Sequence, residues 1–228
     1  MKNVITIDGP SGSGKGTISK LLARKLGYNY LDTGALYRAV AWKAREEKID
    51  PDNEDGLGRI LEKIKIDFDQ DRIFVDGADV SSEIRTTEIG ELSSQVSDKP
   101  VVRAGLYSIQ RAMGLQGNVV IEGRDTGTAI FPEAENKFYL DAGIEERARR
   151  RYEELKDRAQ VTGHGTETGD NKLTIETVME DIRKRDARDS SRESSPLMKT
   201  DDMIYIDSTH LSIEEVVSKI LGYLKQVT

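Results

Sequence analysis

The 228-residue sequence contains no cysteine, no long apolar segment and no excess of basic residues. Without cysteine, neither a disulfide framework nor a thiolate zinc site can form, which fits a reducing compartment. No segment approaches 18 uninterrupted apolar residues, and the apolar start of the chain meets glycine and charge too early for a signal peptide. We therefore expect a cytoplasmic protein that binds no membrane. The 34 basic and 41 acidic residues give a net charge of −7, which argues against polymeric nucleic acid as a partner.

The chain length suits one sizeable core that carries inserted segments, because two independent domains would each be small. We find no internal repeat and no interdomain linker. The first 42 residues alternate strand and helix patterns twice, which is typical of a parallel sheet covered on both faces. The sequence therefore predicts an α/β fold, a P-loop three-layer sandwich with a mainly parallel central sheet.

The most informative stretch is the first apolar run and the glycine-rich loop after it. Residues 4–8 predict a buried parallel strand, and helical spacing returns after residue 17. Between them, Gly9, Gly14 and Lys15 have the spacing of a phosphate-binding loop, whose backbone N–H groups surround phosphate oxygens at the N-terminus of a helix. We expect phosphates to be bound by the whole loop: Gly9, Pro10, Ser11, Gly12, Ser13, Gly14, Lys15, Gly16 and Thr17.

One position departs from the usual phosphate-binding motif. The residue after Lys15 is commonly a serine or threonine that ligates magnesium, but here it is Gly16, and the hydroxyl comes one residue later at Thr17. The motif therefore leaves the metal ligands open. A Gly-Lys-Gly-Thr ending is similar to that of the nucleoside monophosphate kinases.

The rest of the chain mixes strand, helix and loop patterns. Residues 65–69 and 72–76 alternate around a polar turn and predict an antiparallel hairpin inserted into the α/β chain. Residues 157–172 are polar and rich in glycine, which predicts a mobile loop or lid. The other expected elements are strands at 28–32, 118–125, 137–141 and 203–207, helices at 35–42, 89–96, 101–113, 145–155 and 173–189, and a final helix after a capping box of Ser212 and Glu215.

Charged residues follow the predicted strands, where ligands bind in open α/β sheets. Asp32, Arg38, Arg124 and Asp125 stand at such positions. Arginine suits phosphate because its planar fork binds two oxygens at once. Each residue taken alone could equally be a solvated surface charge.

A second group of arginines recurs at helical spacing near residue 190. Arg185, Arg188 and Arg192 would share one helix face, with Asp189 one turn from Arg185. Like charges on one stripe repel unless an anion lies between them, so this stripe favours an anionic ligand. Arg147, Arg150 and Arg151 on the preceding helix could contribute to the same anion site from the far side of the lid, but the neighbouring glutamates favour plain ion pairs for them.

Seven short motifs follow one another along the chain: residues 9–17, 31–38, 82–86, 94–96, 122–128, 185–189 and 207–209. In this order they resemble the bacterial-type cytidylate kinases, which are P-loop nucleoside monophosphate kinases, and the resemblance covers nearly the whole chain. The most specific elements are Gly123-Arg124-Asp125 and Arg185-Asp186-Ala187-Arg188-Asp189. Two departures are Thr33, where a serine is common, and a loop over residues 162–171 that is longer and more polar than expected for the family.

The resemblance implies that the protein transfers the γ-phosphoryl group of ATP, with Mg²⁺, to CMP or dCMP in pyrimidine nucleotide metabolism. It implies one P-loop kinase domain over residues 1–228, with a nucleoside monophosphate (NMP)-binding lobe at about 33–115 and a lid at about 157–173. We expect small-molecule substrates only, and a monomer.

The resemblance also implies roles for individual side chains. Arg38, Arg124 and Arg192 match residues that hold the acceptor phosphate, Arg185 and Asp189 match residues that face the sugar, and Ser94, Arg103 and Asp125 match residues that address cytosine. Thr33 completes the expected substrate-binding set, and Lys15, Arg124, Arg188 and Arg192 are expected to act on the transferring group. Chemistry supports the cytosine set, because a carboxylate complements the cytosine amino group and would face a carbonyl oxygen in uracil.

Two other functions stay open. One is another P-loop small-molecule kinase that acts on AMP, UMP or shikimate. The other is a nucleotide-sensing module that retains or hydrolyses ATP without an acceptor. The inserted hairpin and the paired arginine groups favour a kinase with a second anionic substrate.

Overall fold

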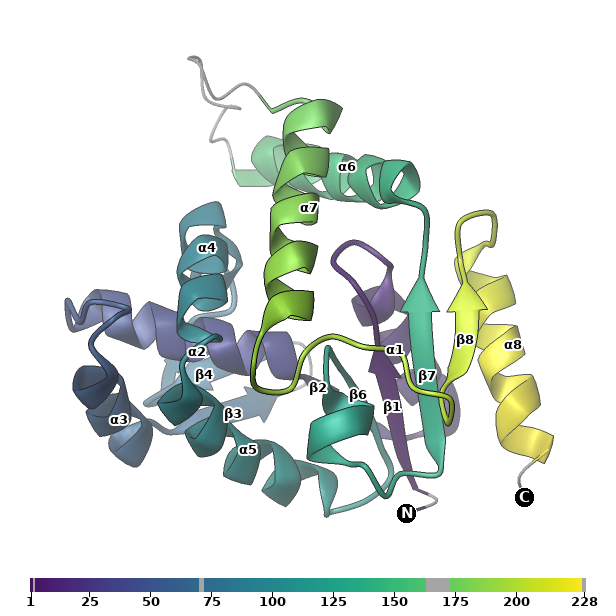
Figure 1. Cartoon of the computed structure of the whole chain (residues 1–228), viewed down its shortest axis with the longest axis horizontal. Coiled ribbons are helices and arrows are strands. Elements are labelled where there is room, and N and C mark those ends of the chain that lie inside the picture. Colours follow the sequence, from purple (N-terminus) through teal and green to yellow (C-terminus); the bar gives the residue numbers. More distant parts are fainter. Residues whose placement is uncertain (2, 70–71, 163–172, 227–228) are drawn as a thin grey trace.

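The computed structural model describes residues 1, 3–69, 72–162 and 173–226. At its centre is a parallel sheet of five strands in the order β2-β6-β1-β7-β8 (Figure 1). This confirms the predicted α/β class with a mainly parallel sheet. The strands are β1 (Val4–Asp8), β2 (Asn29–Asp32), β6 (Val119–Gly123), β7 (Asn136–Asp141) and β8 (Ile204–Asp207).

Helices cover both faces of this sheet, because its strands carry apolar side chains on both sides. In β6, Val120 points to one face, while Val119 and Ile121 point to the other, as strand alternation requires. The first face packs against α1 (Lys15–Leu26) and α8 (Ile213–Gln226), and the second packs against α2 (Thr33–Glu46) and α5 (Pro100–Gly114). The expected capping box begins α8: the N–H of Ser212 donates to Glu215, and the N–H of Glu215 donates to the Ser212 hydroxyl.

A smaller antiparallel sheet lies beside α2 and confirms the predicted hairpin. Its strands pair in the order β3-β4-β5, with Ile66 opposite Val75 and Asp69 opposite Arg72. The turn residues 70–71 lie outside the described residues. The short strand β5 was not expected. The bounds are β3 (Ile66–Asp69), β4 (Arg72–Val75) and β5 (Ala78–Asp79), followed by one 3₁₀ turn, η1 (Glu83–Arg85).

Two further helices of this region pack against α2. α4 (Thr87–Val96) was expected, whereas α3 (Glu54–Lys63) was not recognised from the apolar spacing. α3 has a local start signal, because the Asn53 side chain accepts a hydrogen bond from the N–H of Gly56 at 2.9 Å. After β6, residues Thr126–Ile130 form a π-helical turn, η2, that packs against β1.

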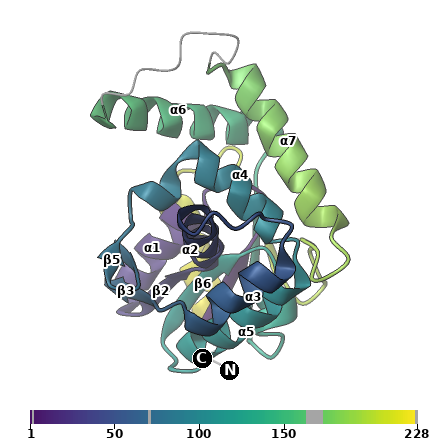
Figure 2. The ribbon, with the colours of Figure 1, turned by 90° about the vertical axis from the view of Figure 1, so that its left-hand side faces the viewer.

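The last two long helices, α6 (Ile144–Thr162) and α7 (Ile175–Ser191), lie above the carboxyl ends of the strands (Figures 1 and 2). They pack on each other through Ala148, Val178 and Ile182. The expectation of a loop over residues 157–172 is wrong for 157–162, which continue α6 because the first helix-breaking glycine is residue 163. Residues 163–172 lie outside the described residues, so the lid assignment stays a prediction, as does the boundary of the lobe at 33–115.

Candidate functional site

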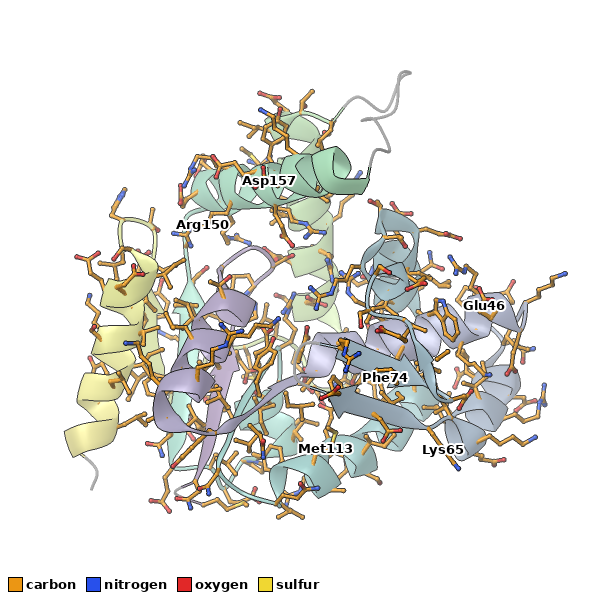
Figure 3. All side chains as sticks on the ribbon, turned by 180° about the vertical axis from the view of Figure 1, so that it is seen from behind. Glu46, Lys65, Phe74, Met113, Arg150 and Asp157 are labelled. Carbon is orange, nitrogen blue, oxygen red and sulfur yellow. The ribbon has the colours of Figure 1, made fainter. Side chains whose placement is uncertain are left out.

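The glycine loop, residues 9–14, joins β1 to α1 beneath α6, close to Arg150 (Figure 3). A Cβ atom on Gly9 would overlap the carbonyl oxygen of Leu140 in β7, so only glycine fits there. Gly14 has a φ of +91° and begins α1 without a side-chain cap. The first N–H groups of α1 therefore line the cleft, at the positive end of the helix. The predicted strand, loop and helix are all present.

Lys15 lies buried inside its own loop. Its Nζ atom donates hydrogen bonds to the carbonyl oxygen of Pro10 at 2.6 Å and to the hydroxyl of Ser13 at 3.3 Å. Burial lowers the pKa of Lys15, and the charge of Arg124 adds to this effect. A cation held in this way stands next to the open N–H groups of α1, where a phosphate group would bind.

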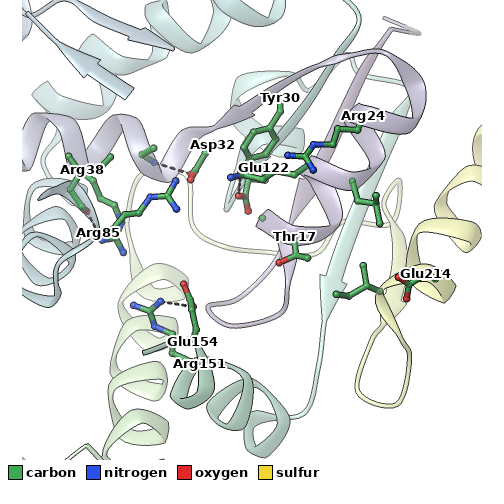
Figure 4. Close-up of a pocket in the computed structure, with 16 residues that line it drawn as sticks. Thr17, Arg24, Tyr30, Asp32, Arg38, Arg85, Glu122, Arg151, Glu154 and Glu214 are labelled. Atoms are coloured by element: carbon green, nitrogen blue, oxygen red, sulfur yellow. Dashed lines mark hydrogen bonds and ion pairs between the residues drawn. The ribbon is translucent and has the colours of Figure 1, made fainter. Parts of the chain in front are cut away.

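Glu122 explains why glycine follows Lys15. A Cβ atom on Gly16 would lie 3.0 Å from Oε1 of Glu122, and Tyr30 donates a hydrogen bond of 2.6 Å to the same oxygen. Burial raises the pKa of Glu122, and the charge of Asp32 adds to the increase. The carboxylate from β6 therefore occupies the space in which the usual serine or threonine side chain would lie (Figure 4).

The oxygen groups of this region fit a magnesium ion. Thr17, Asp32 and Glu122 line one cleft of about 780 Å³ together with the glycine loop. Magnesium prefers hard oxygen ligands and is commonly held by one or two carboxylates together with substrate phosphates. In the described part of the chain, no group of three acidic or histidine residues could hold a metal by itself, so a protein-only metal cage is not what this cleft offers.

Three of the predicted arginines converge on the same cleft. Arg38 comes from α2, Arg124 follows β6, and Arg185 comes from α7. Burial lowers the pKa of Arg185 to about 9, and the charges of Arg124 and Arg38 contribute to this decrease. The three arginines therefore line the same cleft as the glycine loop. Asp189 balances part of this charge by accepting a hydrogen bond of 2.8 Å from Nε of Arg124.

Arg192 shares the carboxylate of Asp189 with Arg124. It follows the last residue of α7, and its Nε donates to the carbonyl oxygen of Asp189 at 3.2 Å. Its Nη2 atom forms an ion pair of 3.7 Å with Oδ1 of Asp189, whose other oxygen accepts from Arg124. Of the arginines expected on the α7 stripe, Arg185 therefore lines the cleft, while Arg192 approaches the same Asp189 from beyond the end of the helix.

The residues predicted to bind a base are buried, and one of them, Ser94, lines a pocket together with Arg38 and Arg185. Arg103 from α5 and Asp125 make an ion pair, and the Nε atom of Arg103 has no partner among the described residues. Burial raises the pKa of Asp125, which the charge of Arg103 opposes. Ser94 from α4 accepts a hydrogen bond of 2.6 Å from Arg188, so Arg188 connects α7 to α4.

Thr33 has a structural partner. Its hydroxyl donates a hydrogen bond of 2.7 Å to the carbonyl oxygen of Glu122, which joins the start of α2 to β6. A serine would supply the same donor, so the threonine at this position keeps the contact.

Asp8 was missed by the sequence reasoning. It is fully buried at the end of β1, and it accepts hydrogen bonds from the N–H and hydroxyl of Thr126 at 2.9 and 2.8 Å and from the N–H of Gly127 at 2.8 Å. Burial raises the pKa of Asp8 to about 6 although these donors oppose the increase. The sequence did contain a signal for Asp8, because a carboxylate at the end of an apolar strand and next to the glycine loop is expected to be buried and to have specific partners.

The arginines of α6 do not all behave as expected. Arg150 pairs with Glu146 and Arg151 with Glu154, as the ion-pair interpretation predicts. Arg147 instead pairs with Asp186 of α7 and donates to the carbonyl oxygen of Ser11 in the glycine loop at 3.0 Å. Neither Arg147 nor Asp186 had been singled out as a site residue, because both contacts are long-range.

Comparisons with known proteins agree on one family. The family model described as cytidylate kinase matches residues 5–226. A cytidylate kinase of Geobacter sp. (strain M21) is 45% identical over 94% of this chain and 89% of its own length. A cytidylate kinase of Stutzerimonas stutzeri (strain A1501) is 46% identical over 96% of this chain and 93% of its own length.

A solved structure shares the fold. The crystal structure of an uncharacterized protein from Eubacterium ventriosum covers 97% of this chain and 98% of its own, with a TM-score of 0.50 and 13% identity. At this identity the likeness concerns the fold alone.

Proposed function

Because the chain belongs to the cytidylate kinase family, we propose that it transfers the γ-phosphoryl group of ATP to CMP or dCMP, giving ADP and CDP or dCDP. The observation that carries the proposal is the convergence of Arg38, Arg124 and Arg185 opposite the glycine loop. Such a group of cations suits an anionic acceptor that must approach a second, more highly charged anion.

The donor side is assigned to the glycine loop and Lys15. The open N–H groups at the start of α1 and the buried ammonium group would hold the phosphates of ATP. Mg²⁺, held by phosphate oxygens and by Thr17, Asp32 or Glu122, would supply charge neutralisation during the transfer.

The acceptor side is assigned to the arginines and the buried base group. Arg38, Arg124 and Arg192 would hold the phosphate of CMP, and Arg185 and Asp189 would face its sugar. Ser94, Arg103 and Asp125 would bind cytosine, and Arg188 would act on the transferring group together with Lys15, Arg124 and Arg192. A phosphate acceptor is already an anion near neutral pH, so the transfer needs positioning and charge stabilisation and no strong general base.

The remaining assignments belong to the same proposal. Residues 33–115 would form the NMP-binding lobe and residues 157–173 a lid that excludes water, which otherwise competes as acceptor. We further propose a monomer that acts in the cytoplasm in pyrimidine nucleotide metabolism. In the described residues, no helix has both the length and the apolar composition needed to cross a bilayer.

A coupled ADP-release assay tests the function. With ATP and Mg²⁺, we expect the highest kcat/KM for CMP or dCMP, and lower values for UMP, AMP and shikimate. A higher kcat/KM with any of the last three would show that CMP and dCMP are not the preferred acceptors. ADP release without any acceptor, together with no CMP binding in calorimetry, would favour the nucleotide-sensing module.

A further inference from the structure

Both main-chain polar groups of Ser11, in the middle of the glycine loop, are bonded to side chains of α6 and α7. The N–H of Ser11 donates to Oδ1 of Asp186 at 3.0 Å, and its carbonyl oxygen accepts from Nη1 of Arg147 at 3.0 Å. The same Nη1 atom is paired with Oδ2 of Asp186. These three contacts form a closed ring, which we call the Ser11 clasp, between residues that are 39 to 175 positions apart.

The Ser11 clasp is firmly held on the α6 side. Nε of Arg147 donates to the carbonyl oxygen of Ala142 at 2.9 Å, which fixes the plane of the guanidinium group. The backbone of Arg147 also lies close to the loop, because a Cβ atom on Gly12 would be 3.0 Å from its carbonyl oxygen. The side chains of Arg147 and Asp186 are only 11% and 19% exposed, so solvent screens their charges little.

On the other side, Asp186 stands among the acceptor residues of α7. Arg185 precedes it and lines the cleft, while Asp189, three residues on, bonds Arg124. Arg188 bonds Ser94 of α4. Because a helix moves as a rigid rod, a shift of α7 that brings these side chains to an acceptor must also move the Asp186 carboxylate relative to Ser11.

The charge of Asp186 is unexpected at this place. It lies near Lys15 and Arg124, and its negative charge weakly opposes the decrease that burial causes in the pKa of the lysine. A carboxylate beside a phosphate-binding loop opposes the binding of an anion, so phosphate affinity does not account for it. The hydrogen bond from the N–H of Ser11 in the loop accounts for the presence of this carboxylate.

We infer that Asp186, held by Arg147, is a positioning residue that couples the acceptor helix α7 to the glycine loop, so that acceptor binding and donor binding strengthen each other. This inference rests on the proposed function. It adds to that function a physical link between the two substrates, carried by one hydrogen bond to the main chain of Ser11.

Calorimetry on the full chain measures this link. The dissociation constant of a non-hydrolysable ATP analogue is determined with Mg²⁺, with and without saturating CMP. In the wild type we expect CMP to tighten analogue binding by about fivefold or more, and the analogue to tighten CMP binding equally, because coupling free energies are reciprocal. In Asp186→Ala we expect this factor to fall below about twofold, with each separate dissociation constant changed by less than about threefold and kcat lowered by about tenfold or more.

Four further variants separate coupling from folding. Glu180→Ala removes the same charge from an exposed position of α7 and should keep the wild-type coupling. Asp186→Asn keeps an oxygen acceptor for Ser11 but loses the charge that holds Arg147, so its coupling should be intermediate. Arg147→Ala should lose the coupling as Asp186→Ala does, and the double variant should lose no more, because the two residues act as a unit.

The inference is overturned if the wild type shows no coupling, or if Asp186→Ala keeps the wild-type factor while only its melting temperature falls, since the Ser11 clasp would then be structural. Should Asp186→Ala not fold, Asp186→Asn replaces it, and wild-type coupling in that variant also overturns the inference. If CMP is not the preferred acceptor, the proposed function fails, and the same measurement is made with the acceptor that is preferred.

Discussion

Asp8 and Asp125 are both buried carboxyl groups near the ends of neighbouring strands, but their partners differ. Asp125 faces the guanidinium group of Arg103, so its charge is balanced. The hydrogen bonds that Asp8 accepts among the described residues come from uncharged groups, the N–H and hydroxyl of Thr126 and the N–H of Gly127. Asp125 is therefore suited to recognising a hydrogen-bond donor of a ligand, whereas Asp8 is suited to holding two segments of the chain together.

We predict that Asp125→Asn reduces the preference for CMP over UMP. The carboxylate complements the amino group of cytosine, whereas an amide can present its own N–H groups to the carbonyl oxygen of uracil. Sites built on hydrogen bonds can discriminate by roughly 10⁴, so we expect the ratio of kcat/KM values to fall by about tenfold or more. An unchanged ratio would remove Asp125 from base recognition.

We also predict that Asp8 makes the protein less stable as the pH rises from about 4 to about 6. In that range the carboxyl is protonated in the folded protein, where its pKa is about 6, and ionised in the unfolded chain, so the folded state binds more protons. The full shift corresponds to about 3 kcal/mol, taken as an upper bound. The test is urea unfolding of the wild type and Asp8→Asn at several pH values.

In that test, the difference in unfolding free energy between the wild type and Asp8→Asn isolates Asp8, because other titrating groups cancel. The wild type should lose stability relative to Asp8→Asn as the pH rises from about 4 to about 6, and the difference should stay constant above a pH of about 7. A difference that does not vary with pH would show that the Asp8 carboxyl has an ordinary pKa.

At the scale of the elements, two helical glycines show how the packing differs from place to place. Gly114 closes α5, and a Cβ atom there would overlap Cζ of the buried Phe131. Gly222 lies in α8, and in the described part of the chain no atom beyond its own stretch of helix backbone lies within 4 Å of the position that a Cβ atom would take there. The same substitution therefore has opposite consequences at two helical positions.

We predict that Gly114→Ala destabilises the protein by about 1–3 kcal/mol, because Phe131 must move in a close-packed layer. Gly222→Ala should stabilise it by about 0.5–1 kcal/mol, because alanine favours the helix and limits the unfolded chain. Chemical denaturation of both variants measures the two free energies of unfolding. Equal effects in the two variants would contradict the packing seen around Phe131.

At the scale of the whole molecule, the acceptor site joins parts of the chain that are distant in sequence. Arg38, Arg103, Arg124 and Arg185 come from α2, α5, the end of β6 and α7. A ligand that contacts all of them binds only the folded arrangement. Its binding free energy therefore adds to the stability of the complete fold.

We predict that CMP at 100 times its dissociation constant raises the free energy of unfolding by about 2.7 kcal/mol. The measurement is thermal or chemical unfolding over a CMP titration without ATP, with UMP at the same concentrations as the control. UMP should give a smaller increase because it does not complement Asp125. Equal increases from CMP and UMP would mean that the base does not contribute to recognition.

Much of the fold was predictable because its signals are local. The glycine loop, the strands of the central sheet and the hairpin before residue 76 each depend on neighbouring residues, and all are present. The end of α6 was misplaced because polarity was taken as a sign of a loop, although residues 157–162 contain no glycine or proline. α3 was overlooked, although Asn53 caps it.

The sequence by itself determined the class of fold, the phosphate-binding loop and the set of arginines, because spacing along the chain carries that information. Only the tertiary structure decided which charges meet. Glu122 fills the space beside Gly16, Asp8 holds Thr126, and the Ser11 clasp joins the loop to α6 and α7. Those contacts join residues more than a hundred positions apart, whose approach depends on how the strands order themselves in the sheet.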